Sequence, residues 1–195
     1  MNYKIFKDAE QINRIVADED FVKEYCSDNG YTYELEVPPE PSETEADVVR
    51  DAKLAEISAA CNAAIVAGFD IELTGETEHF NLSIEDQSNI ANLFRVVELG
   101  GNEFPYQSDG GRCRVYTARE IAQIYIAAQT VITTQTTYHN ALKAYVQSLA
   151  DVEKISAVTY GMTLPKKYAA ETQEKLAVAQ TQMGAIAARL NGTEG

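Results

Sequence analysis

A short segment rich in proline and acidic residues constrains the fold of this chain more than any other feature. Residues 34–47 hold six acidic residues, no Lys or Arg, and three of the five prolines. Proline removes a backbone donor and favours extended geometry, and the like charges repel one another. We therefore predict an acidic, proline-rich linker at 36–48, which separates a small module at 1–35 from the rest. A docking peptide is the alternative interpretation of this segment.

The first 35 residues have the pattern of a compact ββαβ module. Tyr3 and Ile5 alternate with polar neighbours, and a second apolar run follows at 12–16 after a turn at 8–10. Asp18 is a suitable N-cap for a helix that ends at Asn29-Gly30, and residues 31–35 read as a closing strand. So short a unit buries little surface, so we expect it to dock on another surface.

Tyrosines are concentrated in this module. The chain has eleven tyrosines and no tryptophan, and the module holds Tyr3, Tyr25, Tyr31 and Tyr33. Tyrosine joins apolar contact area to a polar tip, which suits protein interfaces. The same four residues can instead form the small core of the module. Both interpretations remain open at this point.

Residues 49–150 have the pattern of a mainly helical domain with two short β-hairpins. Apolar residues at helical spacing predict helices that end near Gly68 and Gly100, and hairpins are predicted at 69–82 and 102–116. Ser83 with Asp86, and Thr117 with Glu120, have the spacing of capping boxes. An apolar stripe from 121 to 149 then predicts one helix of roughly 45–50 Å. The fold class is thus α+β and mostly helical.

The C-terminal part, 151–195, is predicted to hold a short helix near 152–160, a break at 161–165 and a last helix. The apolar and small residues of the last helix follow a heptad register, and they are Ala169, Thr172, Leu176, Ala179, Met183, Ile186 and Leu190. One interpretation is a weak coiled coil with another copy or another protein. The other is a helix that packs on its own domain. The candidate interface residues are the four module tyrosines with Leu176, Met183, Ile186 and Leu190.

Charge and cysteine usage restrict the partners and the compartment. The net charge is −14 and the pI is about 4.5, so nucleic acid and anionic membranes are poor partners. The chain lacks the pattern of a signal peptide and a run of about 18 apolar residues. Cys26, Cys61 and Cys113 are odd in number and far apart, so neither a disulfide framework nor a zinc site is expected. A reducing compartment is expected.

No catalytic motif stands out. His79 lies beside Glu76 and Glu78, but those carboxylates and the imidazole do not share a face of any element, so a metal site is not expected. The chain has no G-x-S-x-G or S-x-x-K motif and no phosphate-binding glycine loop. His139 lies on the predicted long helix beside Tyr138, and neither histidine is near a cysteine in the sequence. We predict no catalytic residues, no metal and no cofactor, and therefore not an enzyme.

Five segments of the middle part carry a family resemblance, and they are 57–65, 67–69, 79–82, 85–89 and 115–120. They resemble a domain of unknown function that is encoded among tail, baseplate and tail-fibre genes of bacteriophages and prophages. Residues 1–8 and 16–21 and the acidic linker are likewise similar to small phage tail-region proteins of Gram-positive bacteria. The resemblance implies a place in a phage particle or its assembly, and no reaction.

Together these observations lead to a hypothesis of function. We expect a structural component of a phage tail or tail-like particle, near the baseplate or the fibre attachment, which docks on other tail, baseplate or fibre proteins. It would be located in the host cytoplasm during assembly and then in the virion. A homo-oligomer is a further expectation. The alternatives are an assembly chaperone that leaves the particle and, third, an enzyme such as a wall hydrolase carried on the tail.

Overall fold

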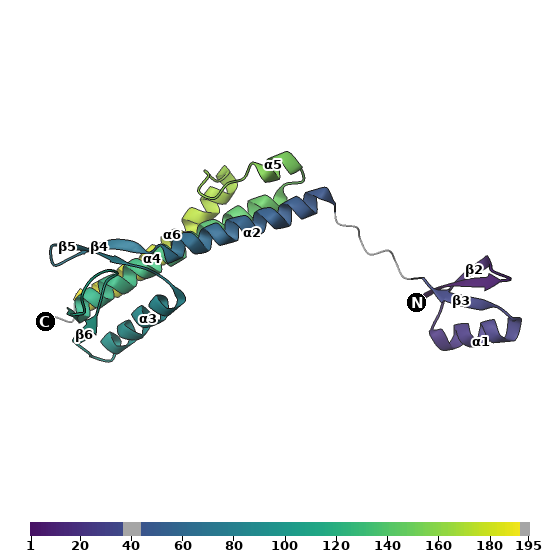
Figure 1. Cartoon of the computed structure of the whole chain (residues 1–195), viewed down its shortest axis with the longest axis horizontal. Coiled ribbons are helices and arrows are strands. Elements are labelled where there is room, and N and C mark those ends of the chain that lie inside the picture. Colours follow the sequence, from purple (N-terminus) through teal and green to yellow (C-terminus); the bar gives the residue numbers. More distant parts are fainter. Residues whose placement is uncertain (37–43, 192–195) are drawn as a thin grey trace. The chain divides into compact units, whose positions relative to one another are not determined.

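The structure, a computed structural model, describes residues 1–36 and 44–191, except the side chains of 190 and 191. The chain divides into two compact units, Met1–Glu43 and Thr44–Gly195 (Figure 1). The centre of the predicted linker, residues 37–43, lies outside the described residues. The division therefore falls within the segment in which the prolines and acidic residues are concentrated.

The first unit is a three-stranded antiparallel sheet with one helix packed against it. The strands β1 (Asn2–Lys7), β2 (Glu10–Val16) and β3 (Thr32–Leu35) lie in the order β2-β1-β3, and α1 (Glu19–Asn29) connects β2 to β3. The predicted ββαβ module is confirmed. Its core consists of four buried residues from β1 and α1, which are Tyr3, Ile5, Val22 and Cys26.

Local hydrogen bonds set the two ends of α1. The Asp18 carboxylate accepts a hydrogen bond from the Phe21 N–H at 2.9 Å, which satisfies one of the free donors at the start of the helix. Gly30 follows the last turn with φ of +67°, and its N–H bonds to the Cys26 carbonyl. Glycine adopts this left-handed conformation without a Cβ clash, so the helix ends where the sequence predicts.

Helix α4 is the central element of the second unit. Helices α2 (Glu45–Val66), α3 (Ile84–Glu98) and α6 (Lys166–Asn191) all pack on α4 (Ala118–Ser148), and the short α5 (Val152–Ser156) packs on α2 (Figure 1). Helix α4 has 31 residues and so a length of about 46 Å at about 1.5 Å per residue. The long helix predicted from the apolar stripe is confirmed.

Helix α2 begins earlier than predicted. Its first residue is Glu45, within the segment 36–48 predicted as linker, and its N-cap is Thr44. The Thr44 hydroxyl accepts from the Asp47 N–H at 3.2 Å, and the Asp47 carboxylate accepts from the Thr44 N–H at 3.2 Å. This reciprocal capping box starts the helix as soon as the prolines end, because the acidic residues of its first turn interact favourably with the helix dipole.

Two hairpins join the helices of the second unit. Strands β4 (Phe69–Leu73) and β5 (Glu76–Phe80) form the first, and β6 (Glu103–Tyr106) and β7 (Arg114–Thr117) form the second. The first hairpin lies within the predicted range 69–82, and its second strand begins at Glu76. Thr74 and Gly75 both have positive φ, so two residues complete the turn and Leu73 pairs directly with Glu76.

The core of the second unit consists of two clusters along α4. In one, the hairpins and α3 cover the N-terminal part of α4, with Phe80, Phe94 and Tyr116 packed beside Ile121 and Ile124. In the other, α2 and the segment around α5 cover the C-terminal part, where Ile57, Ile155 and Val158 pack with Leu142 and Val146. The first cluster fixes the hairpins against the first turns of α4.

Helix α6 packs along α4, as the own-domain interpretation of the heptad pattern proposed. Leu176, Ala179, Met183 and Ile186 are half-buried, and Thr172 is the one α6 residue in the buried set of the described residues. The Leu190 side chain lies outside the described residues. The heptad positions from 176 to 186 therefore face a helix of the same chain.

Candidate functional site

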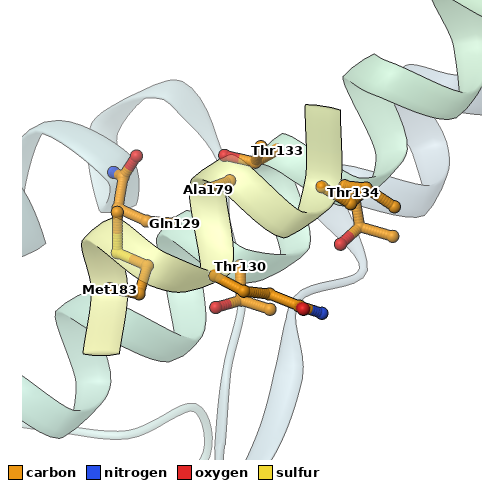
Figure 2. Close-up of a pocket in the computed structure, with 8 residues that line it drawn as sticks. Gln129, Thr130, Thr133, Thr134, Ala179 and Met183 are labelled. Carbon is orange, nitrogen blue, oxygen red and sulfur yellow. The ribbon is translucent and has the colours of Figure 1, made fainter. Parts of the chain in front are cut away.

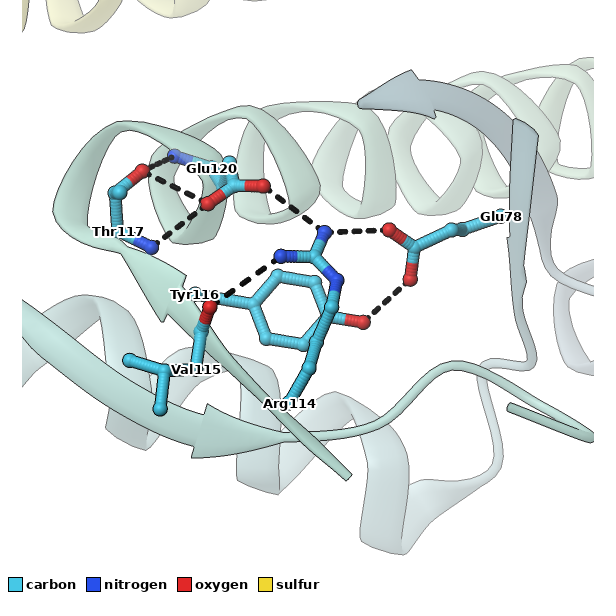
Figure 3. A network of polar contacts seen from close by, with 6 residues as sticks. All are labelled: Glu78, Arg114, Val115, Tyr116, Thr117 and Glu120. Atoms are coloured by element: carbon cyan, nitrogen blue, oxygen red, sulfur yellow. Dashed lines mark hydrogen bonds and ion pairs between the residues drawn. The ribbon is translucent and has the colours of Figure 1, made fainter. Parts of the chain in front are cut away.

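A network of charged and polar side chains joins the two hairpins to the start of α4 (Figure 3). Arg114 Nη2 on β7 lies 2.5 Å from Glu78 Oε1 on β5 and 2.9 Å from Glu120 Oε1 on α4. The Tyr116 hydroxyl donates to Glu78 Oε2 at 2.5 Å, and the Arg114 guanidinium lies 3.5 Å from the centre of the Tyr116 ring. One arginine thus bridges two carboxylates and stacks on an aromatic ring.

Local structure places each member of this network. Residues 114 and 116 are two apart on β7, so both side chains lie on the same face of the hairpin. Glu120 is the N3 residue of α4, and its Oε2 accepts from the Thr117 N–H and hydroxyl at 2.8 and 2.9 Å. Its Oε1 remains free to pair with Arg114. The predicted capping box of Thr117 and Glu120 therefore also positions one carboxylate of the network.

The network shifts the pKa values of its members. Burial acts to raise the pKa of Glu78, but the hydrogen bonds from Arg114 and Tyr116 outweigh it and hold the pKa below its ordinary value. Burial likewise opposes ionisation of Glu120, whose pKa is lowered by its bonds to Thr117 and Arg114. Burial and the bond to Glu78 raise the pKa of Tyr116 to about 12. Both carboxylates are charged and Tyr116 is neutral at pH 7.

The network has the properties of a structural clamp. The side chains of Glu78 and Glu120 are 11% and 8% exposed, and both carboxylates are paired with Arg114. A general acid or base needs an accessible carboxyl group with a pKa near the working pH, whereas these pKa values are lowered. The arrangement holds β5, β7 and α4 together and offers no free group to a substrate.

A second polar cluster surrounds His79 on the first hairpin. Its Nδ1 lies 2.7 Å from Asp70 Oδ1 and its Nε2 lies 3.2 Å from Asn81 Oδ1. The hydrogen bond to Asp70 raises the pKa of His79, whereas burial and the nearby Lys143 lower the pKa of His139. The His79 side chain is 41% exposed and its ring nitrogens face oxygen acceptors, so the cluster favours an imidazolium. The Glu78 carboxylate pairs with Arg114 and Tyr116, so it does not form a common site with His79.

The cysteines and the acidic residues form no metal site in the described parts of the chain. Cys26 and Cys61 are buried, and Cys113 is exposed. Across residues 1–36 and 44–191 there is no group of three or more His, Cys, Asp or Glu side chains placed to hold a metal ion. None of the helices in these two ranges is long and apolar enough to cross a membrane.

A small cavity lies between α4 and α6 (Figure 2). Its walls are Gln129, Thr130, Thr133 and Thr134 of α4 and Leu176, Ala179, Gln180 and Met183 of α6. Its volume is about 30 Å³. Such a volume accommodates one or two water molecules and no organic ligand, since a single water needs roughly 10–15 Å³ measured in this way.

The candidate interface residues occupy different environments. Tyr3 is 2% exposed and belongs to the core of the module, and Tyr25, Tyr31 and Tyr33 are half-buried against that core. All four tyrosines thus pack in or against the small core of the module, as one of the two interpretations proposed. Leu176, Met183 and Ile186 are half-buried on α6. The clamp of Glu78, Arg114, Tyr116 and Glu120 was not predicted, and only the capping-box spacing of Glu120 gave a signal for it.

Comparison with known proteins gives one match. The model of the family described as a domain of unknown function, DUF4376, matches residues 48–160. No curated protein and no solved structure matches the chain. The match includes most of α2, all of α3, α4 and α5, and both hairpins, and so it contains the whole clamp. It also extends the segment 57–120, in which the resemblance to a domain of unknown function was found. Since the match covers more than half of the 195 residues, the chain belongs to the DUF4376 family.

Proposed function

We propose that this protein is a structural component of a phage tail or tail-like particle, near the baseplate or the fibre attachment, which acts by docking on other proteins. The observation that carries the proposal is the division of the chain into two compact units, each with a hydrophobic core of its own. Linking two docking elements raises the effective concentration of the second contact. The resemblance to proteins of phage tail gene clusters supplies the setting.

The polar side chains support a docking role over catalysis. Glu78 and Glu120 are both paired with Arg114, and the ring nitrogens of His79 are occupied by Asp70 and Asn81. A base within hydrogen-bonding distance is one common means of activating a nucleophile, and the nitrogens of His79 already have partners. The proposal therefore includes no reaction, cofactor or metal.

Mass spectrometry of purified particles tests this proposal. We expect peptides of both units in mature particles, at a constant ratio to the known tail proteins. A chain that lacks residues 1–36 should be incorporated less than the full chain, since it would lose one of two docking elements. Absence of the protein from mature particles would contradict the proposal.

The second candidate is an assembly chaperone for fibre or tail proteins, which the net charge of −14 favours because it keeps a transiently bound protein soluble. Such a chaperone would co-purify with fibre protein from infected cells and be missing from finished particles. The two measurements together therefore separate the two functions.

A further inference from the structure

An open concavity lies between α3 and β6, and we call it the α3 concavity. It is lined by Asn89, Asn92, Leu93, Val96 and Tyr106, with a volume of about 290 Å³. Tyr106 is half-buried and stacks on Phe80, with ring centres 6.2 Å apart and an angle of 4° between the planes. This stacking fixes the Tyr106 ring, so the concavity has a rigid aromatic wall.

Apolar surface continues from the concavity along α3. Val96 is 47% exposed, and Leu99, three residues later, is 81% exposed. Residues three apart lie on the same side of a helix, so the two side chains extend one apolar strip towards the end of α3. Exposed apolar groups that adjoin a concave wall are typical of a protein interaction site.

Two amides lie beside this strip. Asn89 and Asn92 are both exposed and three residues apart in the middle of α3. Asparagine favours helix caps and turns over helix interiors, so neither residue serves the stability of the helix. Each amide offers two donors and one acceptor oxygen, a combination that pairs with the N–H and C=O groups of a bound peptide backbone.

The other end of the concavity is acidic. Glu85 and Asp86 occupy the first turn of α3, one turn before Asn89. Asp86 stands three residues before Asn89 and seven before Leu93, so it lies on the side of α3 that lines the concavity. Burial raises the pKa of Tyr106, and the charges of Asp86 and Asp109 raise it further. A positive charge is therefore favoured at this end and an apolar group at the other.

We infer that the α3 concavity binds a peptide segment of another protein that carries a Lys or Arg close to a large apolar residue. The apolar side chain lies against Tyr106, Leu93 and Val96, and the cation lies near Asp86 and Asp109. Charge complementarity selects this occupant over a second copy, because two chains of net charge −14 repel each other. The inference rests on the proposed docking function and assigns it a surface.

Selection from a yeast-displayed library of random 12-residue peptides on the full-length protein tests this inference. We expect enriched peptides to combine Lys or Arg with a large apolar residue. By fluorescence anisotropy, a labelled synthetic copy should bind Val96→Lys at least tenfold more weakly and Asn92→Ala several-fold more weakly than the wild type. Val178→Lys is the matched control, because Val178 is a 60% exposed valine on α6, and it should bind as the wild type does.

Three results would overturn the inference. These are a selection that enriches no sequence, enriched peptides that bind Val96→Lys as tightly as the wild type, and a concentration-dependent dimer in light scattering that Val96→Lys abolishes. The last result would assign the surface to a second copy. The peptide measurements use the isolated chain, so they hold or fail separately from the presence of the protein in particles.

Discussion

At the scale of single residues, the clamp joins Arg114 to two buried carboxylates of the second unit. The guanidinium pairs with Glu78 and Glu120 at distances of 2.5 and 2.9 Å, and the carboxylates are almost fully buried. Removing one partner of such a group is costlier than its net contribution suggests, because the remaining charges stay buried without compensation.

Substituting Arg114→Met should therefore destabilise the second unit at pH 7 by roughly 2–3 kcal/mol, below the roughly 3–5 kcal/mol of a fully buried pair. The expected loss is smaller than for a fully buried pair because the Arg114 side chain is 34% exposed. Urea unfolding measures the effect, and Arg112→Met, at an exposed arginine, is the control. Equal stabilities of the two variants would contradict the assigned role.

The same comparison has a defined pH dependence. The folded-state pKa values of Glu78 and Glu120 lie below the ordinary value, so their stabilising contribution is present above about pH 4.3 and is lost as pH falls through the lower folded-state values. In Arg114→Met the buried carboxylates lack their partner, and protonation relieves them. The stability difference between wild type and variant should therefore shrink below about pH 4.

The two histidines should titrate on opposite sides of the ordinary value of about 6.5. The hydrogen bond to Asp70 raises the pKa of His79, and burial lowers the pKa of His139. NMR titration of the two imidazole signals measures both. Asp70→Asn should move the His79 midpoint down and leave that of His139 unchanged. Any stability from protonated His79 is present below about pH 6.5 and is lost as pH rises through its folded-state pKa.

At the scale of elements, turns with glycine at positive φ determine how the strands meet the helices. Gly68 connects α2 to β4 with φ of +72°, and a Cβ there would collide with the Phe80 carbonyl. Gly75, in the turn of the first hairpin, has φ of +86° and open space around it. Both positions therefore require a residue that tolerates positive φ, but only Gly68 also lacks space for a Cβ atom.

Substitution of these two glycines by alanine separates the two effects. Gly75→Ala should cost roughly 1–2 kcal/mol, the cost of a left-handed conformation in a residue with a Cβ. Gly68→Ala should cost clearly more, because β5 must also move away from the new methyl group. Thermal unfolding measures both, and equal losses would contradict the close approach of β5 to Gly68.

At the scale of the whole molecule, two separate cores imply two unfolding transitions. The first unit has four buried core residues, whereas the second has two larger clusters, so the first should unfold at lower urea concentration. Ile5 and Leu142 are each fully buried in their own unit. Each therefore reports on one core alone.

Ile5→Ala should shift only the first transition and Leu142→Ala only the second, by roughly 2–5 kcal/mol each, the usual cost of such a core truncation. Hydrogen exchange with mass spectrometry, read separately for peptides of each unit, measures the two shifts. A single transition that both substitutions move together would contradict the independence of the cores.

Features that depend on neighbouring residues could be predicted from the sequence. Asp18 and Gly30 bound α1, and Ser83 and Thr117 start α3 and α4, as their spacing indicated. Caps and turns satisfy backbone groups within four residues, so their chemistry is present in any short stretch of sequence. The ββαβ module and the long α4 followed from the periods of their apolar residues for the same reason.

Only the tertiary structure decided which distant surfaces meet. Glu78 and Arg114 are 36 residues apart, and no spacing rule pairs them until the two hairpins pack on α4. The heptad pattern of α6 likewise suits a partner chain and a neighbouring helix equally well, because it records only that one face is apolar. Packing on α4 resolved that ambiguity. The acidic proline-rich segment divided the chain by its local chemistry alone, whereas the clamp and the α3 concavity arise from the meeting of elements remote in sequence.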